Sequence, residues 1–318
     1  MKIIFFGSDD FSVVHLEKLI ASGHEISACV TQPDQPQGRG LKVEASPVKL
    51  SAQQQRIPIH QPSSLKDEDW IHQLKAYNCD LFVVVAYGKI LPAQLLEIPS
   101  ICALNVHGSL LPHYRGAAPI NWAIIHGEAT TGVSVIKMSP ALDSGDIFLQ
   151  KEIKIENSDT AVILKAKTAW LGADALDEVI HALQENVYTL TVQDNRKATF
   201  APKLTKELGR IIWEKSAKEI YNLVRGLLPW PTAYTYYQGK MLKILETQLV
   251  SHSFAEEETP YLPGAVVSLE AEGFVVKTGK GHLLIKRVHP ESSRPMDAKS
   301  FTVGHRVTRG FRLECPPL

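Results

Sequence analysis

Short apolar runs alternate with helical patterns through the first half of the chain. Residues 2–6, 26–31 and 80–86 form apolar runs that are typical of strands buried on both faces of a sheet. Between these runs, residues 11–22 and 67–77 repeat apolar side chains at helical spacing. Alternating strands and helices predict an α/β fold with a Rossmann-like, doubly wound and mostly parallel sheet.

The same alternation continues beyond the first half. Helices are expected over residues 47–55 and 160–183, and strands over residues 57–59, 131–138 and 145–155. The strand at 57–59 is short and contains a proline, so we expect it at the edge of the sheet.

The pattern changes in the last third of the chain. Periodicity fades over residues 193–206, a helix is expected over residues 216–226, and short alternating runs follow. These runs, separated by glycines or polar turns, cover residues 234–237, 241–246, 264–268, 273–278 and 282–288. They predict a small antiparallel barrel of the OB-like type.

A chain of 318 residues is long enough for two domains. We therefore expect an α/β domain over residues 1–190, a linker over residues 191–208 and the OB-like domain over residues 209–318.

Charge is unevenly distributed along the chain. Residues 1–200 carry 17 basic and 22 acidic side chains, a net charge of −5, whereas residues 201–318 carry 17 and 12, a net charge of +5. A basic second part favours a polyanionic partner for that part, although so small an excess also fits an ordinary solvated surface.

Composition and missing motifs argue against several classes of protein. Hydrophobic residues make up 44% and charged residues 21%, which are ordinary globular values. No apolar run approaches a membrane span, the N-terminus has no signal-peptide pattern, and the four cysteines lack zinc-ligand spacing. We expect a cytoplasmic protein with reduced thiols, no membrane contact and no metal. Dinucleotide and ATP binding gain no support, because neither glycine-rich phosphate-binding pattern occurs.

Two polar side chains stand where the apolar run 101–104 ends. Asn105 and His107 lie on the same side of an extended chain, at the carboxyl end of a strand, where open α/β sheets bind ligands. An amide donor and an imidazole that exchanges a proton near neutrality suit a carbonyl that becomes an oxyanion. Asp143 is the candidate carboxylate that would orient the imidazole. The alternative is that these are turn residues or satisfied polar groups of the core.

Short sequence patterns give a resemblance to a known family. Asn-x-His at 105–107, Ser-Leu-Leu-Pro at 109–112 and Leu-Asp-x-Gly at 142–145 resemble the signature of the folate-dependent formyltransferases. Arg-Gly-Ala-Ala-Pro-Ile at 115–120 and Pro-Trp-Pro-x-Ala at 229–233 resemble the branch of that family that acts on methionyl-tRNA. The resemblance covers nearly the whole chain and is looser around residue 290, where Glu-Ser-Ser-Arg replaces the family's usual Gly-Lys-Lys.

The resemblance implies an activity and its participants. The chain would transfer the formyl group of 10-formyltetrahydrofolate to the α-amino group of methionyl initiator tRNA, for translation initiation. It would do so as a monomer, with the folate as co-substrate and without a metal. Asn105, His107 and Asp143 match the family's catalytic positions. The first domain would be the formyltransferase catalytic domain and the last the tRNA-binding domain.

The resemblance also implies where the two substrates bind. The folate-binding positions are Tyr87, Gly88, Lys89, Ile90, Leu91, Ser109, Leu110, Leu111 and Pro112. A polar loop from Gln32 to Pro47 matches a basic loop that enters the tRNA acceptor stem, with Arg39 and Lys42 as its cations. Leu41 stands where the family often has a second basic residue. A plain strand-to-helix turn after residue 86 and an ordinary surface loop are the alternatives.

Several functional hypotheses share these residues. An amino-sugar or purine-precursor formyltransferase, or a hydrolase that deformylates the folate, would use the same three polar side chains. An RNA-binding module on an inactive α/β scaffold is the alternative from a different class, and the intact Asn105, His107 and Asp143 argue against it. The basic second part and the Arg39 loop favour a tRNA substrate.

Overall fold

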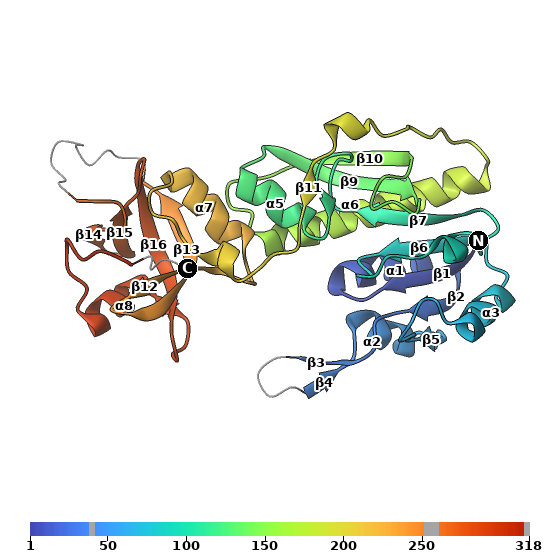
Figure 1. Cartoon of the computed structure of the whole chain (residues 1–318), viewed down its shortest axis with the longest axis horizontal. Helices are drawn as coiled ribbons and strands as arrows, with labels where there is room; N and C mark the ends of the chain where they lie inside the picture. Colours follow the sequence, from blue (N-terminus) through green and yellow to red (C-terminus); the bar gives the residue numbers. More distant parts are fainter. Residues whose placement is uncertain (38–41, 251–260, 315–318) are drawn as a thin grey trace. The chain divides into compact units, whose positions relative to one another are not determined.

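The computed structural model describes residues 1–37, 42–250 and 261–314, with the backbone alone at 35–37 and 42–43. It divides into two compact units (Figure 1). The first unit comprises Met1–Pro119, Thr130–Lys154 and Lys165–Pro202, and the second comprises Ile120–Ala129, Ile155–Leu164 and Lys203–Leu318. None of the helices in the described residues is long and apolar enough to cross a membrane.

A seven-stranded sheet forms the centre of the first unit. Its strands are β1 (Lys2–Gly7), β2 (Glu25–Val30), β5 (Ile59–His60), β6 (Leu81–Val85), β7 (Cys102–His107), β9 (Thr130–Lys137) and β10 (Ile147–Lys154). Their order is β10-β9-β7-β6-β1-β2-β5. The five strands β7, β6, β1, β2 and β5 run parallel to one another, and β9 is antiparallel to both of its neighbours. The prediction of a parallel-dominated α/β sheet is therefore confirmed.

Helices of the first unit begin where the sequence supplies side-chain caps. The helices are α1 (Asp10–Ala21), α2 (Pro47–Gln54), α3 (Glu68–Ala76), α4 (Ala93–Leu96) and α6 (Ala161–Gln184), the last beginning in the second unit. Asp9, Ser46 and Asp67 each accept a hydrogen bond from the backbone N–H three residues ahead, which satisfies an otherwise unpaired donor of the first turn. The predicted long helices are confirmed, with ends shifted by one or two residues.

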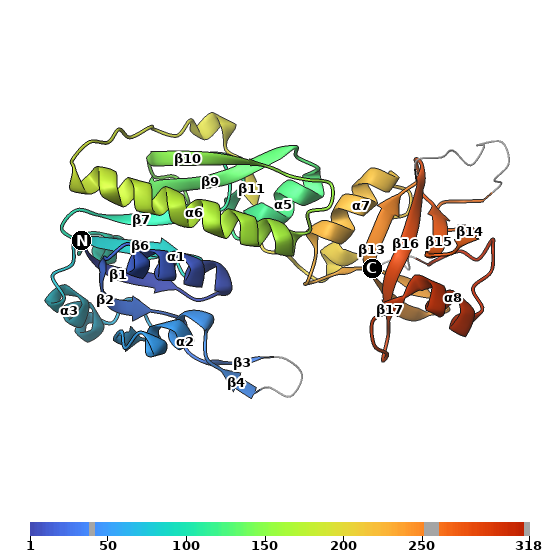
Figure 2. The same cartoon turned by 180° about the vertical axis from the view of Figure 1, so that it is seen from behind.

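Both faces of the sheet are covered, which explains why its central strands are apolar throughout. On one face, Trp70 and Leu74 of α3 pack with Phe6 of β1 and Phe82 of β6. On the other face, α1 and α6 lie in front of the strands (Figure 2). Gly172 lets α6 approach closely, because a Cβ atom there would lie 3.0 Å from Val106 of β7. Val106 thus faces the helices, while Asn105 and His107 point to the opposite side of the sheet.

The second unit is a sheet unit with an amphipathic helix. Its sheet consists of β12 (Ala233–Tyr237), β13 (Lys240–Leu249), β14 (Val266–Glu270), β15 (Gly273–Lys277), β16 (His282–Pro290) and β17 (Met296–Asp297). All pairings are antiparallel, in the order β12-β13-β16-β15-β14, and β17 pairs with β16. Helix α7 (Ala217–Gly226) begins with a capping box between Ser216 and Glu219. The five predicted strands and this helix are confirmed.

Backbone hydrogen bonds near the end of the chain join the two edges of this sheet. Glu314 exchanges two hydrogen bonds with Tyr236 of β12, and Leu313 donates to Gly264, just before β14. The apolar core inside the unit includes Trp213, Phe274 and Phe301, the last on helix α8 (Ala298–His305). The periodicity of the sequence did not predict α8 or β17.

Two local predictions differ from the structure. The polar loop that begins at Gln32 contains a hairpin of β3 (Gln35–Gln37) and β4 (Lys42–Glu44). The edge strand lies at 59–60 rather than 57–59, because Pro58 has no N–H and joins β2 only through its carbonyl, which accepts from Cys29. The aperiodic segment after α6 contains short ordered elements over residues 195–197, 200–201 and 207–209.

Helix α1 buries a histidine completely in the first unit. His15 Nδ1 lies 2.8 Å from the Phe11 carbonyl oxygen, which can only accept, so Nδ1 carries the proton. His15 Nε2 has no hydrogen-bond partner among the described residues. Burial lowers the pKa of His15 to about 4 from its ordinary value of 6.5, because the cation would be desolvated.

This lowered pKa predicts a specific loss of stability in mild acid. The unfolded chain binds a proton at His15 near pH 6.5, and the folded chain binds it only near pH 4. Falling pH therefore favours the unfolded state, by about 2 kcal/mol between pH 7 and pH 5. His15→Asn keeps an N–H donor for Phe11 and removes the titration. We expect its free energy of unfolding in urea to depend less on pH than that of the parent protein. Equal pH slopes would contradict the assignment.

Candidate active site

The carboxyl end of β7 carries the two polar residues that the sequence singled out. Asn105 and His107 alternate with Val106 and therefore project from the same face of the strand. The His107 side chain is almost fully buried. On the neighbouring antiparallel strand, Ile136 pairs with Asn105 and Ser134 pairs with His107.

Asp143 reaches these residues from the loop between β9 and β10. Its Oδ1 accepts from the Asn105 amide at 3.4 Å, and its Oδ2 lies 3.7 Å from His107 Nδ1. The backbone N–H of Gly116 donates to Oδ2 at 2.9 Å. The structure thus brings together the three side chains that the sequence predicted.

The loop that carries Asp143 has to fold back toward β7. Lys137, at the end of β9, pairs with Leu104, which precedes Asn105. Asp143 itself adopts the left-handed region at φ 48°, which is uncommon for a residue other than glycine. Gly145 passes so close to the Lys137 carbonyl that a Cβ atom would lie 1.7 Å from the oxygen. Close backbone packing therefore sets the position of the carboxylate.

The hydrogen bonds of His107 define its protonation sites. Nε2 lies 2.8 Å from the carbonyl oxygen of Tyr114, which can only accept, so Nε2 carries a proton. The proton that would make the ring cationic therefore binds at Nδ1, on the side of Asp143. An imidazole with one fixed proton and one exchangeable proton beside a carboxylate can stabilise a developing anion or transfer a proton.

Polar side chains of β9 and β10 form hydrogen bonds with the backbone of the segment Ser109–Pro112. Ser134 donates to the Ser109 carbonyl at 2.7 Å and accepts from the Leu111 N–H at 3.0 Å. Gln150 donates to the Leu111 carbonyl at 3.0 Å and to Ser134 at 2.8 Å. Ser109 is itself buried and donates to the His113 carbonyl at 2.6 Å. Hydrogen bonds of Ser109, Ser134 and Gln150 therefore fix the loop. The sequence analysis did not predict the roles of Ser134 and Gln150.

The second predicted folate segment, Tyr87–Leu91, follows the adjacent strand β6. Tyr87 is buried, with its ring against Phe6 at a centroid distance of 5.5 Å, and burial raises its pKa to about 12. Its carbonyl accepts from the Gln32 amide at 2.9 Å. Gly88 turns the chain with φ 81°, and Ile90 then stands 71% exposed at the surface. Because β6 and β7 are parallel neighbours, this segment and Ser109–Pro112 leave the sheet at the same edge.

The predicted tRNA contacts belong to the loop that precedes α2. Arg39 lies outside the described residues, and Lys42 lies in β4, where the backbone alone is described. Before the hairpin, Asp34 accepts from Lys49 at 2.5 Å and from the Gln61 amide at 2.7 Å. These two hydrogen bonds, that of Lys49 above all, lower the pKa of the Asp34 carboxyl group.

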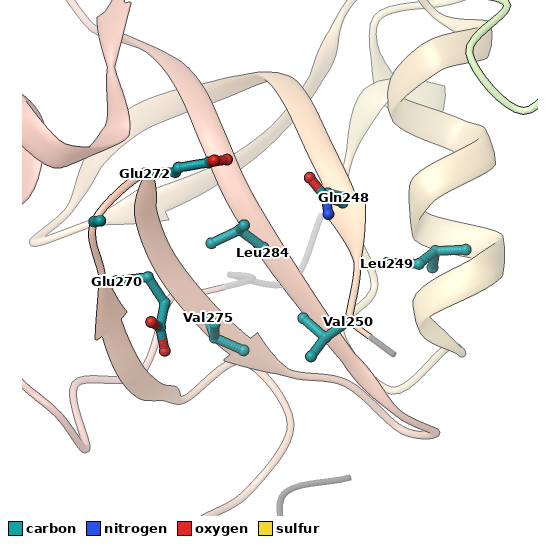
Figure 3. A pocket seen from close by; sticks show the side chains of 8 residues that line it. Gln248, Leu249, Val250, Glu270, Glu272, Val275 and Leu284 are labelled. Atoms are coloured by element: carbon teal, nitrogen blue, oxygen red, sulfur yellow. The ribbon is translucent and has the colours of Figure 1, made fainter. Parts of the chain in front are cut away.

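Surface hollows lie among the described residues of the second unit. One of about 280 Å³ is lined by Gln248, Glu270, Glu272 and apolar side chains of β13, β15 and β16 (Figure 3). The other, of about 750 Å³, includes Lys286 and Arg287 in its wall. The charged side chains of the first hollow are both carboxylates, whereas the second contains Arg225, Lys286 and Arg287 beside one carboxylate, Glu246, so the second suits an anionic ligand better.

Comparison with known proteins covers both units of the chain. The family described as Formyl transferase matches residues 1–180, and the one described as Formyl transferase, C-terminal domain, matches residues 203–306. The methionyl-tRNA formyltransferase of Caldanaerobacter subterraneus subsp. tengcongensis is 44% identical over 99% of this chain and 100% of its own length. That of Acetivibrio thermocellus is 42% identical over 98% of both chains.

Solved structures share the fold at much lower sequence identity. The sugar 3N-formyl transferase WlaRD, solved with dTDP and 5-N-formyl-THF, is 18% identical with a TM-score of 0.66, over 92% of this chain and 98% of its own. HypX from Aquifex aeolicus, in complex with tetrahydrofolic acid, is 18% identical with a TM-score of 0.65, over 95% of this chain and 47% of its own. Sequence matches and shared fold lead to one conclusion: this chain belongs to the formyl transferase family.

Proposed function

We propose that this chain transfers the formyl group of 10-formyltetrahydrofolate to the α-amino group of methionine on initiator tRNA, for translation initiation. The observation that carries the proposal is that relatives named methionyl-tRNA formyltransferase are 42–44% identical to the chain from end to end, through both units. The sugar-modifying neighbour reaches 18%. Sequence similarity therefore favours the tRNA substrate over an amino sugar.

The proposed catalytic residues are Asn105, His107 and Asp143. The neutral amine attacks the formyl carbon, a C–N bond forms, and the carbonyl oxygen becomes an oxyanion. The Asn105 amide and the His107 imidazole stabilise that charge, and one well-placed donor contributes a few kcal/mol, roughly 3. The bond to N10 of the folate then breaks, the amine nitrogen loses a proton and the folate nitrogen gains one.

Asp143 supports this chemistry electrostatically. Its carboxylate lies 3.7 Å from His107 Nδ1, so it would orient the ring and favour its cationic form. Two carriers are compatible with this arrangement for the proton that the amine loses, namely His107 itself or a water bound to Asp143.

We also propose that the folate binds along the two segments that leave the sheet beside each other. The pterin would lie against Tyr87–Leu91, and Ser109–Pro112 would complete the site. Support comes from the parallel pairing of β6 and β7, which places both segments at the edge where α/β sheets bind ligands. Buried anchors in each segment, Tyr87 and Leu111, would keep the backbone in place for the ligand.

The second domain would supply an RNA-binding surface as an OB-like barrel. Its six-stranded antiparallel sheet and the hydrogen bonds of Leu313 and Glu314 across its edges support the barrel, and the net charge of +5 over residues 201–318 supports a polyanionic ligand. We propose a catalytic domain over residues 1–190, a linker over 191–208 and this tRNA-binding domain over 209–318. We also propose that the protein acts in the cytoplasm, where its tRNA substrate would be, and that it is a monomer.

The proposed function is tested by offering three formyl acceptors in parallel. With 10-formyltetrahydrofolate as donor, we expect product with methionyl initiator tRNA, and far less with glycinamide ribonucleotide or with water. Preferential formylation of the ribonucleotide would indicate a purine-precursor enzyme. Release of formate without an acceptor would indicate a hydrolase.

The catalytic assignment predicts large losses from single substitutions. Asn105→Ala, His107→Ala and Asp143→Ala should each lower kcat at least about 100-fold while the thermal transition of the protein remains, because each removes a prearranged electrostatic partner. His72→Ala, at an exposed position on α3, is the matched control and should keep parental turnover. Near-parental kcat in folded His107→Ala would refute the proposed mechanism.

The predicted tRNA loop gives a separate test at Arg39. A guanidinium forms paired hydrogen bonds with base edges or phosphates that an ammonium cannot copy. We expect Arg39→Ala to lower kcat/KM for methionyl-tRNA severely, and Arg39→Lys to recover only part of the loss. Titration with a folate analogue is the internal control and should be unchanged. If Arg39→Ala formylates methionyl-tRNA like the parent, the loop does not contact the tRNA.

A further inference from the structure

The aperiodic segment after α6 returns to the candidate active site. It contains the 3-10 helix η1 (Asn195–Lys197) and strand β11 (Phe200–Ala201), and β11 pairs in parallel with β8 (Arg115–Gly116). Ahead of η1, Gln193 is only 6% exposed. A buried glutamine needs partners for both amide protons and for its carbonyl oxygen, and this one finds them in the two loops that carry the site.

The amide nitrogen of Gln193 holds the loop of Asp143. Nε2 donates to the carbonyl oxygens of Asp143 at 2.9 Å and of Gly145 at 2.7 Å. The two amide protons therefore bind the carbonyl groups on either side of Ser144. The backbone at Asp143 is in the left-handed region, so external hydrogen bonds stabilise a conformation that the residue does not favour by itself.

The oxygen of the same amide holds a buried arginine in the other loop. Gln193 Oε1 accepts from Arg115 Nε at 3.2 Å and from Nη2 at 2.7 Å, and Nη2 also donates to Asn195 at 2.8 Å. Rotating the amide by half a turn would oppose its NH2 group to the guanidinium and its oxygen to two carbonyls. Hydrogen bonding thus fixes the orientation of Gln193.

Arg115 lies between the two backbone groups that contact the candidate catalytic side chains. The carbonyl of Tyr114 accepts from His107, and the N–H of Gly116 donates to the Asp143 carboxylate. The returning segment also binds this backbone directly, because Thr199 Oγ1 accepts from the Tyr114 N–H at 2.8 Å. Gln193 is therefore linked to the partners of both His107 and Asp143.

We propose that Gln193 is a positioning residue for formyl transfer. It couples the Asp143 loop to the Arg115 loop and so sets the distance between the Asp143 carboxylate and His107. This inference rests on the proposed roles of Asp143 and His107. Misplacing a reacting group by about 1 Å can cost about 100-fold in rate, so losing this link should lower turnover rather than substrate affinity.

The test uses two substitutions at Gln193 in the full-length protein. Gln193→Glu keeps an oxygen for Arg115 and removes both donated hydrogen bonds, and Gln193→Met removes all of them at similar volume. Each should lower kcat about 10-fold or more, with KM for tRNA and folate changed less than about 3-fold.

A double-mutant cycle separates positioning from general stabilisation. In the Asp143→Ala background, Gln193→Met should cost little further activity, because the carboxylate that it positions is gone. An equal loss in both backgrounds, or parental kcat in folded Gln193→Met, would overturn the proposal. If Gln193→Met does not fold, the same cycle is measured with Gln193→Glu, and the same outcomes support or overturn the proposal.

A matched control lies in the same segment. Arg196 has a 90% exposed side chain and forms an ion pair with Asp194, the residue before η1, so Arg196→Ala should leave kcat unchanged. The cycle is run with whichever acceptor the parent enzyme formylates. If methionyl-tRNA is not formylated, the proposed function is refuted but the cycle can still be measured with another acceptor. If Gln193→Met lowers kcat equally in the parent and in the Asp143→Ala background, only the role of Gln193 is refuted.

Discussion

The Asp143 carboxylate is the point at which distant segments of the first unit meet. Its two oxygens contact the Asn105 amide and the His107 ring, both carried by β7, and the Gly116 N–H of β8, while Asp143 itself comes from the loop after β9. A carboxylate in a partly buried site can only be used if its partners are already in place, because electrostatic stabilisation in proteins depends on prearranged dipoles. The loops around the site are organised to meet that requirement.

Buried polar side chains beneath these loops provide the arrangement. Ser134 and Gln150 support Ser109–Pro112 from the strands, and Gln193 joins the Asp143 loop to Arg115. Leaving one such buried group without its partner costs about 1–3 kcal/mol, so the hydrogen bonds favour one loop conformation over its alternatives. The parallel strands form a rigid edge of the sheet, and the hydrogen bonds of these side chains fix the loops that follow the strands.

The antiparallel strand β9 explains why the site needs so many supports. A parallel strand would end at the same edge as β7, but β9 runs the other way and its end pairs with Leu104. The following loop must fold back to present Asp143, which accounts for the left-handed backbone there and for Gly145 against the Lys137 carbonyl. The family membership of the chain and the geometry of this loop together connect the fold to acyl-transfer chemistry.

Local signals in the sequence determined the elements and the three polar side chains. Apolar runs predicted the central strands, because both sheet faces are covered, and alternation placed Asn105 and His107 on one side of β7. Asp67 and Ser216 cap the helices that begin at the next residue, because a cap interacts within its own first turn. Such features depend on neighbours in the sequence and are therefore readable from it.

Tertiary structure alone decided the features that depend on distant partners. Gln193 lies in a polar stretch without periodicity, and its partners Asp143 and Arg115 precede it by 50 and 78 residues. The return of β11 to β8 and the chain-end residues that join the second sheet's edges have no local signal either. Hydrogen bonds between remote segments form only after the sheets have brought those segments together, so no spacing along the chain could reveal them.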